Sequence, residues 1–167
     1  MTAEANAIVE DEQLGGIDES DDATPDYTAT VNGNVSNNGN WGADEFDRVT
    51  QIQVGAETAV AVPDAGSVTV YWSQSGVYQD EVATNAAASL LVNSDGTYTF
   101  TLLDNMLIAS GQGELIDSLG TVTFTGADND GDTATVSLVL QVKDDIPGTM
   151  TAEANAIVED EQLGGID

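Results

Sequence analysis

Residues 119–142, which read LGTVTFTGADNDGDTATVSLVLQV, decide the fold class of this chain. Polar and apolar residues alternate on both sides of a centre rich in Gly and Asp, residues 126–132. In the second run the apolar positions are Ala134, Val136, Leu138, Leu140 and Val142. A period of two places these side chains on one face of a β-strand. The stretch therefore predicts two antiparallel strands, 119–125 and 133–142, joined by a turn.

The same alternation recurs along the chain. It predicts further strands in residues 27–35, 48–54, 67–72 and 97–103. The sequence NSDG at 93–96 tolerates positive φ and predicts a hairpin turn. Short strands joined by Gly, Asn and Asp turns predict an all-β fold, an antiparallel β-sandwich of immunoglobulin-like architecture.

Two parts of the chain fit this pattern less simply. Residues 104–119 suit either a helical turn or a loop that crosses between the sheets. Near the end, Pro147 favours an extended exit from the last strand. We therefore expect one sandwich in residues 1–146, followed in residues 147–167 by a linker and the first strand of a next repeat.

An internal repeat explains that division. Residues 150–167 repeat residues 1–18 letter for letter, as MTAEANAIVEDEQLGGID, and begin 149 residues later (150 − 1). This predicts a tandem array, with a cloning artefact as the alternative; identical copies in series add length or avidity. The two copies have equal claim on one strand position. We expect residues 151–167 to fray in a monomer or to pair head to tail with another molecule.

The charge of the chain restricts its partners. Thirty Asp and Glu residues stand against only Arg48 and Lys143, which gives a formal net charge of −28. Such a chain repels nucleic acid and anionic membranes, and no apolar run is long enough to insert into a bilayer. Because 41% of the residues are hydrophobic, we expect it to fold once cations offset the repulsion. No signal peptide opens the sequence.

The missing residue types narrow the chemistry further. Cys and His are both absent, which excludes disulfides, imidazole bases and the usual zinc sites. Carboxylate and carbonyl oxygens remain, and Ca²⁺ accepts six to eight of them in flexible geometry. We expect several calcium ions per repeat and no enzymatic activity, because abundant carboxylates alone do not make a glycosidase.

The most specific group of candidate ligands is Asp128, Asp130 and Asp132, at alternate positions of one turn. An EF-hand would need Gly and Glu where this chain has Thr133 and Val139, so the turn is not an EF-hand. The alternative is a solvated hairpin tip.

A second set of carboxylates flanks the linker, and a third precedes residue 48. The second set comprises Asp144, Asp145, Glu159, Asp160 and Glu161, with the first-copy counterparts Glu10, Asp11 and Glu12. The third comprises Asp44, Glu45 and Asp47. Calcium at the second set would lock neighbouring domains together, whereas the alternative is a flexible acidic linker. A fourth group, Asp18, Glu19, Asp21 and Asp22, suits a solvated loop.

Three segments carry a resemblance to a known family: IVEDEQLGG (8–16), SDGTYTFTLL (94–103) and GADNDGDTATVSLVLQVKDDIP (126–147). They resemble the immunoglobulin-like extender repeats of giant bacterial adhesins of the repeats-in-toxin (RTX) class, exported by type I secretion. The resemblance implies calcium-dependent rigidity and an extracellular, cell-surface location. It points to Asp128, Asp130, Asp132, Asp144 and Asp145 as calcium ligands, and less directly to Glu10, Asp11 and Glu12.

The expected function is accordingly structural. Calcium outside the cell would fold and stiffen each repeat, so that identical neighbours in one chain project a distal adhesive domain for surface attachment and biofilm formation. The alternative is a surface-binding or carbohydrate-binding sandwich whose aromatic residues stack on sugars. The residues available for that role are Trp41, Tyr71, Trp72 and Tyr78.

Overall fold

A computed structural model describes residues 6–10, 28–37, 41, 43–108 and 116–143. These residues form an all-β fold with two packed sheets. The elements in chain order are β1 (Ala7–Glu10), β2 (Thr30–Asn34), a 3-10 turn η2 (Val35–Asn37), β3 (Phe46–Val54), β4 (Val60–Ala61), β5 (Ser67–Ser73), β6 (Ala86–Asn93), β7 (Thr97–Leu102), β8 (Ile116–Asp128) and β9 (Thr133–Lys143).

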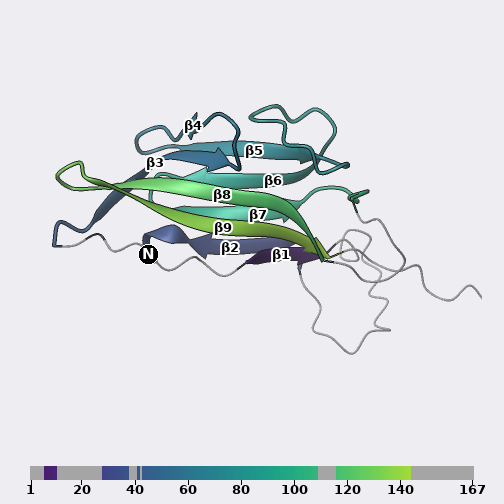
Figure 1. Ribbon diagram of the computed structural model, residues 1–167, viewed down its shortest axis with the longest axis horizontal. Helices are drawn as coiled ribbons and strands as arrows, with labels where there is room; N and C mark the ends of the chain where they lie inside the picture. The colour runs from purple at the N-terminus through teal and green to yellow at the C-terminus, as the bar shows by residue number, and fades with distance from the viewer. Residues whose placement is uncertain (1–5, 11–27, 38–40, 42, 109–115, 144–167) are drawn as a thin grey trace, which may run out of the picture.

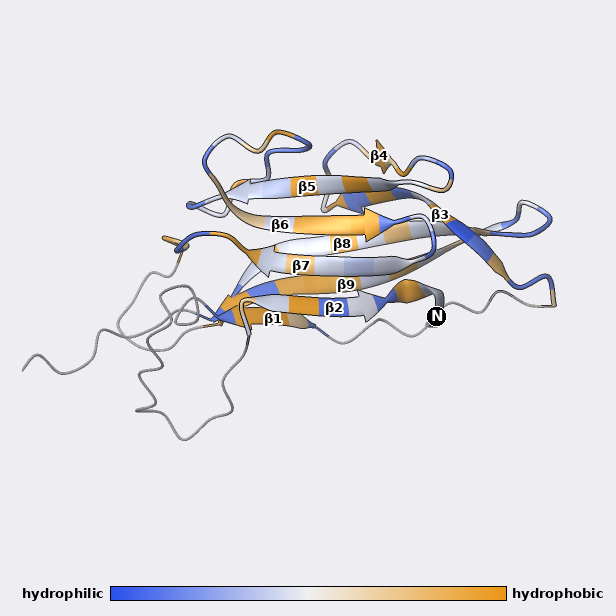
Figure 2. Ribbon diagram, turned by 180° about the vertical axis from the view of Figure 1, so that it is seen from behind, coloured by the Kyte–Doolittle hydropathy of each residue, from blue (hydrophilic) through white to orange (hydrophobic). Residues whose placement is uncertain are grey.

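The two sheets form the layers of a β-sandwich. One sheet has five strands in the order β1-β9-β8-β3-β4, and the other has four strands in the order β2-β7-β6-β5. Figures 1 and 2 view the sandwich from opposite sides, with the five-stranded sheet nearer in the first and the four-stranded sheet nearer in the second. The predicted sandwich is therefore confirmed at the level of its layers.

One feature of the sheets differs from the prediction of a purely antiparallel sandwich. The edge strand β1 runs parallel to β9, with Ala7 opposite Leu140 and Glu10 opposite Lys143. The five-stranded sheet is therefore mixed, whereas the four-stranded sheet is antiparallel throughout. Alternation within a segment identifies a strand but carries no information about the direction of a neighbour far away in sequence.

The strands predicted from alternation agree closely with the structure. The predicted strand 67–72 is β5, the strand 97–103 is β7, and the NSDG turn joins β6 to β7. The long hairpin of β8 and β9 is also confirmed. However, β8 begins at Ile116, so part of the stretch expected to be a loop or a helical turn is strand. Residues 104–108 are not in a regular element, and residues 109–115 lie outside the described part.

The core lies between the two sheets. Inward-facing residues of β8 and β9, such as Phe124 and Leu138, pack against the other sheet, where Trp72, Leu90 and Phe100 are fully buried. In Figure 2 β1 and β6 are largely hydrophobic in colour, whereas the turn between β8 and β9 is hydrophilic. The described residues contain no helix that is long and apolar enough to cross a membrane.

The strands give the sandwich two distinct ends. At the hairpin end, β8 turns into β9 through residues 129–132. At the exit end, β9 finishes at Lys143 beside Glu10 of β1 (Figure 1). Because β1 and β9 are parallel neighbours, the chain runs along this edge in the same direction in the first and the last strand of the described residues.

Candidate metal centre

The turn between β8 and β9 is held by the side chain of Asp128. Its Oδ1 accepts hydrogen bonds from the backbone N–H of Gly131 at 3.0 Å and of Asp132 at 2.8 Å. The backbone N–H of Asp128 donates to the carbonyl of Asp132 at 3.0 Å. Gly131 has φ of 98°, a left-handed conformation that side chains disfavour. The sequence DNDGD therefore folds into a tight acidic turn.

A second segment brings Asp44 to this turn. Phe46, at the start of β3, lies opposite Asp128 in the sheet. The side-chain amide of Asn129 donates a hydrogen bond to the carbonyl of Asp44 at 2.5 Å. Between Asp44 and Phe46 in the sequence, Glu45 adopts a φ of 59°, a conformation that is energetically unfavourable for a residue other than glycine. Long-range pairing of β3 with β8 thus positions Asp44.

Aromatic packing by Trp41 contacts both the start of β3 and the end of β8. The rings of Trp41 and Phe46 lie 4.9 Å apart between centroids, and the indole N–H of Trp41 donates to the carbonyl of Ser36 at 2.8 Å. The Trp41 ring covers Gly126 of β8 so closely that a Cβ atom there would lie 2.4 Å from it. Glycine at position 126 therefore allows the Trp41 segment to approach the hairpin.

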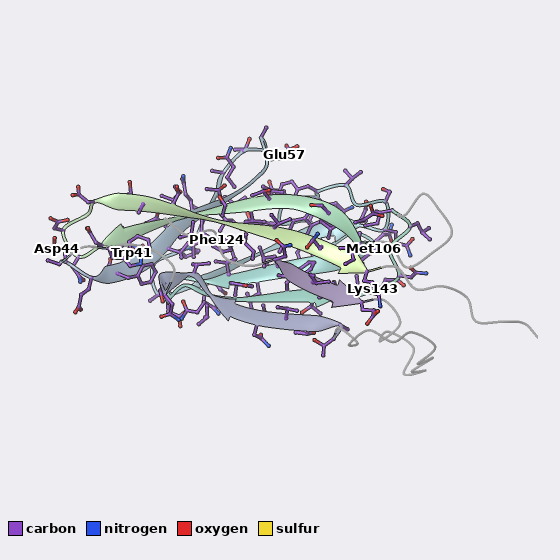
Figure 3. The ribbon with its side chains drawn as sticks, turned by 60° about the horizontal axis from the view of Figure 1, so that its bottom comes forward. Trp41, Asp44, Glu57, Met106, Phe124 and Lys143 are labelled. Carbon is purple, nitrogen blue, oxygen red and sulfur yellow. The ribbon has the colours of Figure 1, made fainter. Side chains whose placement is uncertain are left out.

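Together these contacts assemble an acidic triad of Asp44, Asp128 and Asp130. One carboxylate oxygen from each lies within 4.8 Å of the other two. Asp44 and Asp130 are exposed, and Asp128 is half-buried. Figure 3 shows Asp44 and Trp41 at the same end of the sandwich, far from Lys143. Among the described residues, this triad is the one cluster of acidic side chains close enough together to hold a metal ion.

The electrostatics of the triad reflect its crowding. Hydrogen bonding between the carboxyl groups of Asp128 and Asp130 lowers the pKa of Asp128 from its usual range. The same interaction raises the pKa of Asp130, to which the negative charge of Asp128 also contributes. The crowded carboxylates therefore repel one another when no cation is bound. A bound divalent cation would offset this repulsion.

The donor set suits a hard cation. The triad consists only of oxygen ligands, and two of its three side chains are exposed to solvent. Ca²⁺ takes such irregular oxygen ligands readily, whereas Mg²⁺ demands a stricter octahedron. The residues present therefore fit a divalent cation such as calcium, with water completing its coordination.

The structure places the other predicted ligands of this end differently. The carboxylate of Asp132 lies outside the group of three, although its backbone closes the turn. Asp47 forms an ion pair with Arg48, from Oδ2 to Nη1 at 2.8 Å, and Arg48 also pairs with Asp64. Arg48 thus neutralises two carboxylates that do not belong to the triad. These contacts border an open depression that Arg48 itself helps to line.

At the exit end, the structure pairs Glu10 with a cation of the chain itself. The Glu10 Oε1 atom lies 2.7 Å from Lys143 Nζ, and only 2% of the Glu10 side chain and 6% of the Lys143 side chain are exposed. Glu10 is therefore already neutralised without a metal ion. The predicted ligands outside the described residues are Asp11, Glu12, Asp144, Asp145, Glu159, Asp160 and Glu161.

Three of the four aromatic residues considered for sugar binding, Trp41, Trp72 and Tyr78, are engaged in packing, whereas Tyr71 is half-buried on β5. Trp72 is fully buried and meets the rings of Tyr78 and Phe100 edge to face, with centroids 5.7 and 6.5 Å away. Trp41 is half-buried against Phe46. These rings therefore contribute to the fold rather than to an open stacking platform.

Comparison with other proteins gives no assignment. None of the models of known protein families matches the chain, and no characterised protein in the comparison is significantly similar to it.

Proposed function

We propose that this chain is a non-catalytic, calcium-stabilised extender repeat of an extracellular bacterial adhesin. The direction of its first and last strands carries the proposal. Because β1 and β9 are parallel neighbours, both strands run toward the exit end, where β9 finishes at Lys143. Copies joined in series would then add length along the strand direction, which is what an extender requires.

The strand order supports an immunoglobulin-like architecture. Named A to G in chain order, with β4 and β5 as C′ and C″, strands C, F and G lie side by side in one sheet, and strands B, E and D lie side by side in the other. Immunoglobulin sandwiches divide these strands in the same way. Two strands depart from that arrangement. β5 (C″) lies beside β6 in the sheet of B, E and D, and β1 (A) lies beside β9 in the sheet of C, F and G.

The acidic triad supports the calcium part of the proposal. The three carboxylates converge at the hairpin end, where a following repeat would meet the exit end of its predecessor. The repeated segment 150–167 and the RTX-like motif in residues 126–147 point to the same array. Calcium outside cells would neutralise part of the net charge of −28 and shift the chain toward its folded state.

The test is thermal unfolding, followed by circular dichroism, in calcium, in the same concentration of magnesium, and in EDTA. Extracellular modules bind calcium with a Kd of about 10⁻⁴ to 10⁻³ M, so calcium at a hundred times Kd would raise Tm by roughly 5–10 °C. We expect a smaller increase with magnesium. Equal melting curves in all three conditions would reject the calcium part of the proposal.

Asp44→Asn provides the matched variant for the triad. Its carboxylate belongs to the triad but forms no hydrogen bond within the turn, which uses only its backbone carbonyl. We expect this variant to lose most of the calcium-dependent increase in Tm and, because repulsion falls, none of its stability in EDTA. Glu57→Gln is the control, since it removes one charge from an exposed side chain far from the triad (Figure 3). An equal loss in both variants would assign the calcium effect to overall charge.

A further inference from the structure

A very short sequence fills the β1 position at the edge of the five-stranded sheet. Four residues, AIVE, pair with Leu140–Lys143 of β9. Ala7 and Val9 point into the core, where they are 1% and 0% exposed, and Glu10 pairs with buried Lys143. The requirements at this position are therefore two small apolar side chains and a carboxylate three residues after the first of them.

A second segment of the same chain meets these requirements fully. Residues 156–159 are also AIVE, within a stretch identical to residues 1–18. Glu159 would therefore occupy the place of Glu10 beside Lys143, and Val158 the place of Val9. No difference in side chains distinguishes the two segments as partners for β9.

The length of chain between β9 and the second segment also permits the exchange. Twelve residues, 144–155, separate Lys143 from residue 156. Parallel neighbours need a connection of about a dozen residues, and twelve extended residues span about 40 Å. Residue 156 would have to lie beside Leu140, only about 10 Å back along the strand. The first segment is tethered by a comparable length, residues 11–29, and the closure cost rises slowly with loop length.

We propose that the β1 position is an exchangeable strand site, which accepts residues 156–159 of the same chain in place of residues 7–10. The effective concentration of a segment tethered by a short linker is in the millimolar range, which favours the chain's own segment over that of another molecule. In a series of repeats, each AIVE segment would lie between two sandwiches and complete either one. The inference depends on strand pairing alone and stands whether or not calcium binds.

The first test uses Val9→Asp, Val158→Asp and the double variant in the full chain. A buried aspartate prevents a segment from filling the position, because an unpaired charge in a core is strongly unfavourable. We expect Tm to change by less than about 2 °C for Val158→Asp, to fall by a few degrees for Val9→Asp, and to fall by about 10 °C or more for the double variant. Should the double variant not fold at all, a folded Val9→Asp protein gives the same answer.

Two results of this test would overturn the proposal. If Val9→Asp is as unstable as the double variant, residues 156–159 do not replace β1. If all three variants melt with the unaltered chain, the β1 position does not matter to the fold. The expected signature is a double variant that loses more than the two single variants together.

A disulfide test identifies the source of the replacing segment. The chain has no cysteine, so Gln141→Cys with Ile157→Cys introduces one unambiguous pair. Gln141 is the register partner of Ile8, and neighbours at that spacing are within reach of a disulfide. In the Val9→Asp background, oxidised glutathione should cross-link the pair within one molecule. Covalent dimers without the internal cross-link would overturn the proposal, as would equal cross-linking in the Val9→Asp, Val158→Asp background.

Discussion

The two ends of the sandwich solve the same electrostatic problem in opposite ways. At the exit end, Glu10 is buried and is neutralised by Lys143, a cation of the chain itself. At the hairpin end, Asp44, Asp128 and Asp130 converge near the surface, and the triad contains no basic side chain. A chain with two basic residues cannot neutralise thirty acids internally. The exit end is therefore neutralised by a side chain of the protein itself, whereas the hairpin end is suited to a cation from solution.

This contrast also separates permanent from conditional stability. A buried ion pair is shielded from salt and does not depend on free calcium. An exposed triad repels itself until a cation binds, so its contribution changes sign with the surrounding solution. An extender that is to stiffen outside the cell requires the second type of site, because the first would be equally stable in both places.

The largest effect should come from removing the buried cation. Lys143→Met removes the basic side chain that is paired with the buried Glu10 carboxylate, and breaking a buried ion pair costs about 3–5 kcal/mol of unfolding free energy. The second AIVE segment cannot compensate, because Glu159 would meet the same apolar side chain. Urea unfolding in EDTA measures the loss independently of calcium.

Arg48→Met is the control for this prediction, because it removes the other basic side chain. The Arg48 side chain is 38% exposed, and exposed pairs contribute about 0–1 kcal/mol. Equal losses of unfolding free energy in the two variants would mean that total charge, and not burial, determines the role of the basic residues. The proposed difference between the two ends would then be wrong at the exit end.

An intermediate effect is expected from Gly126→Ala, which changes no charge. The added methyl group would lie 2.4 Å from the Trp41 ring, and overpacking of this kind costs about 1–3 kcal/mol. Displacing Trp41 should also loosen the segment that carries Asp44 and weaken the calcium-dependent increase in Tm. Trp41→Phe offers more room, so Gly126→Ala should cost less in that background; simple additivity of the two changes would contradict the packing explanation.

The sequence predicts the strands well, because their signals are local. The strands β5, β7 and β9 with their period-two alternation, and the turns NSDG and DNDGD, each span 11 residues or fewer. The parallel neighbour of β9 was not predictable in this way, since β1 and β9 are separated by almost the whole repeat. A parallel edge strand of four residues leaves no turn signal that would reveal its partner.

The candidate metal site shows the same limit. Asp128 and Asp130 were identifiable from their spacing around Gly131, within one turn. Asp44 joins them only because β3 pairs with β8 and Asn129 reaches back to its carbonyl. Charge alone groups Glu10 with the carboxylates of the linker, whereas its burial beside Lys143 depends on the register of β1 against β9. Contacts across the sheet, rather than local composition, decide which carboxylates meet.

The smallest effect should come from Asp95, a carboxylate near the hairpin end that is satisfied by its own turn. The hydroxyl and backbone N–H of Thr97 both donate to Asp95 Oδ1 and hold the pKa of Asp95 below its usual range. A depressed pKa stabilises the fold above the unfolded-state pKa, and this contribution is lost as the pH falls through the folded-state pKa. Because Asp95 is exposed, Asp95→Asn should change the unfolding free energy by at most about 0.5 kcal/mol at pH 7, and by less in acid.

The Tm increase of the Asp95→Asn variant with calcium should equal that of the unaltered chain, because donors within the turn already satisfy this carboxylate. A lost calcium response would extend the cation site beyond the triad and remove the distinction between carboxylates that need a cation from solution and those that do not.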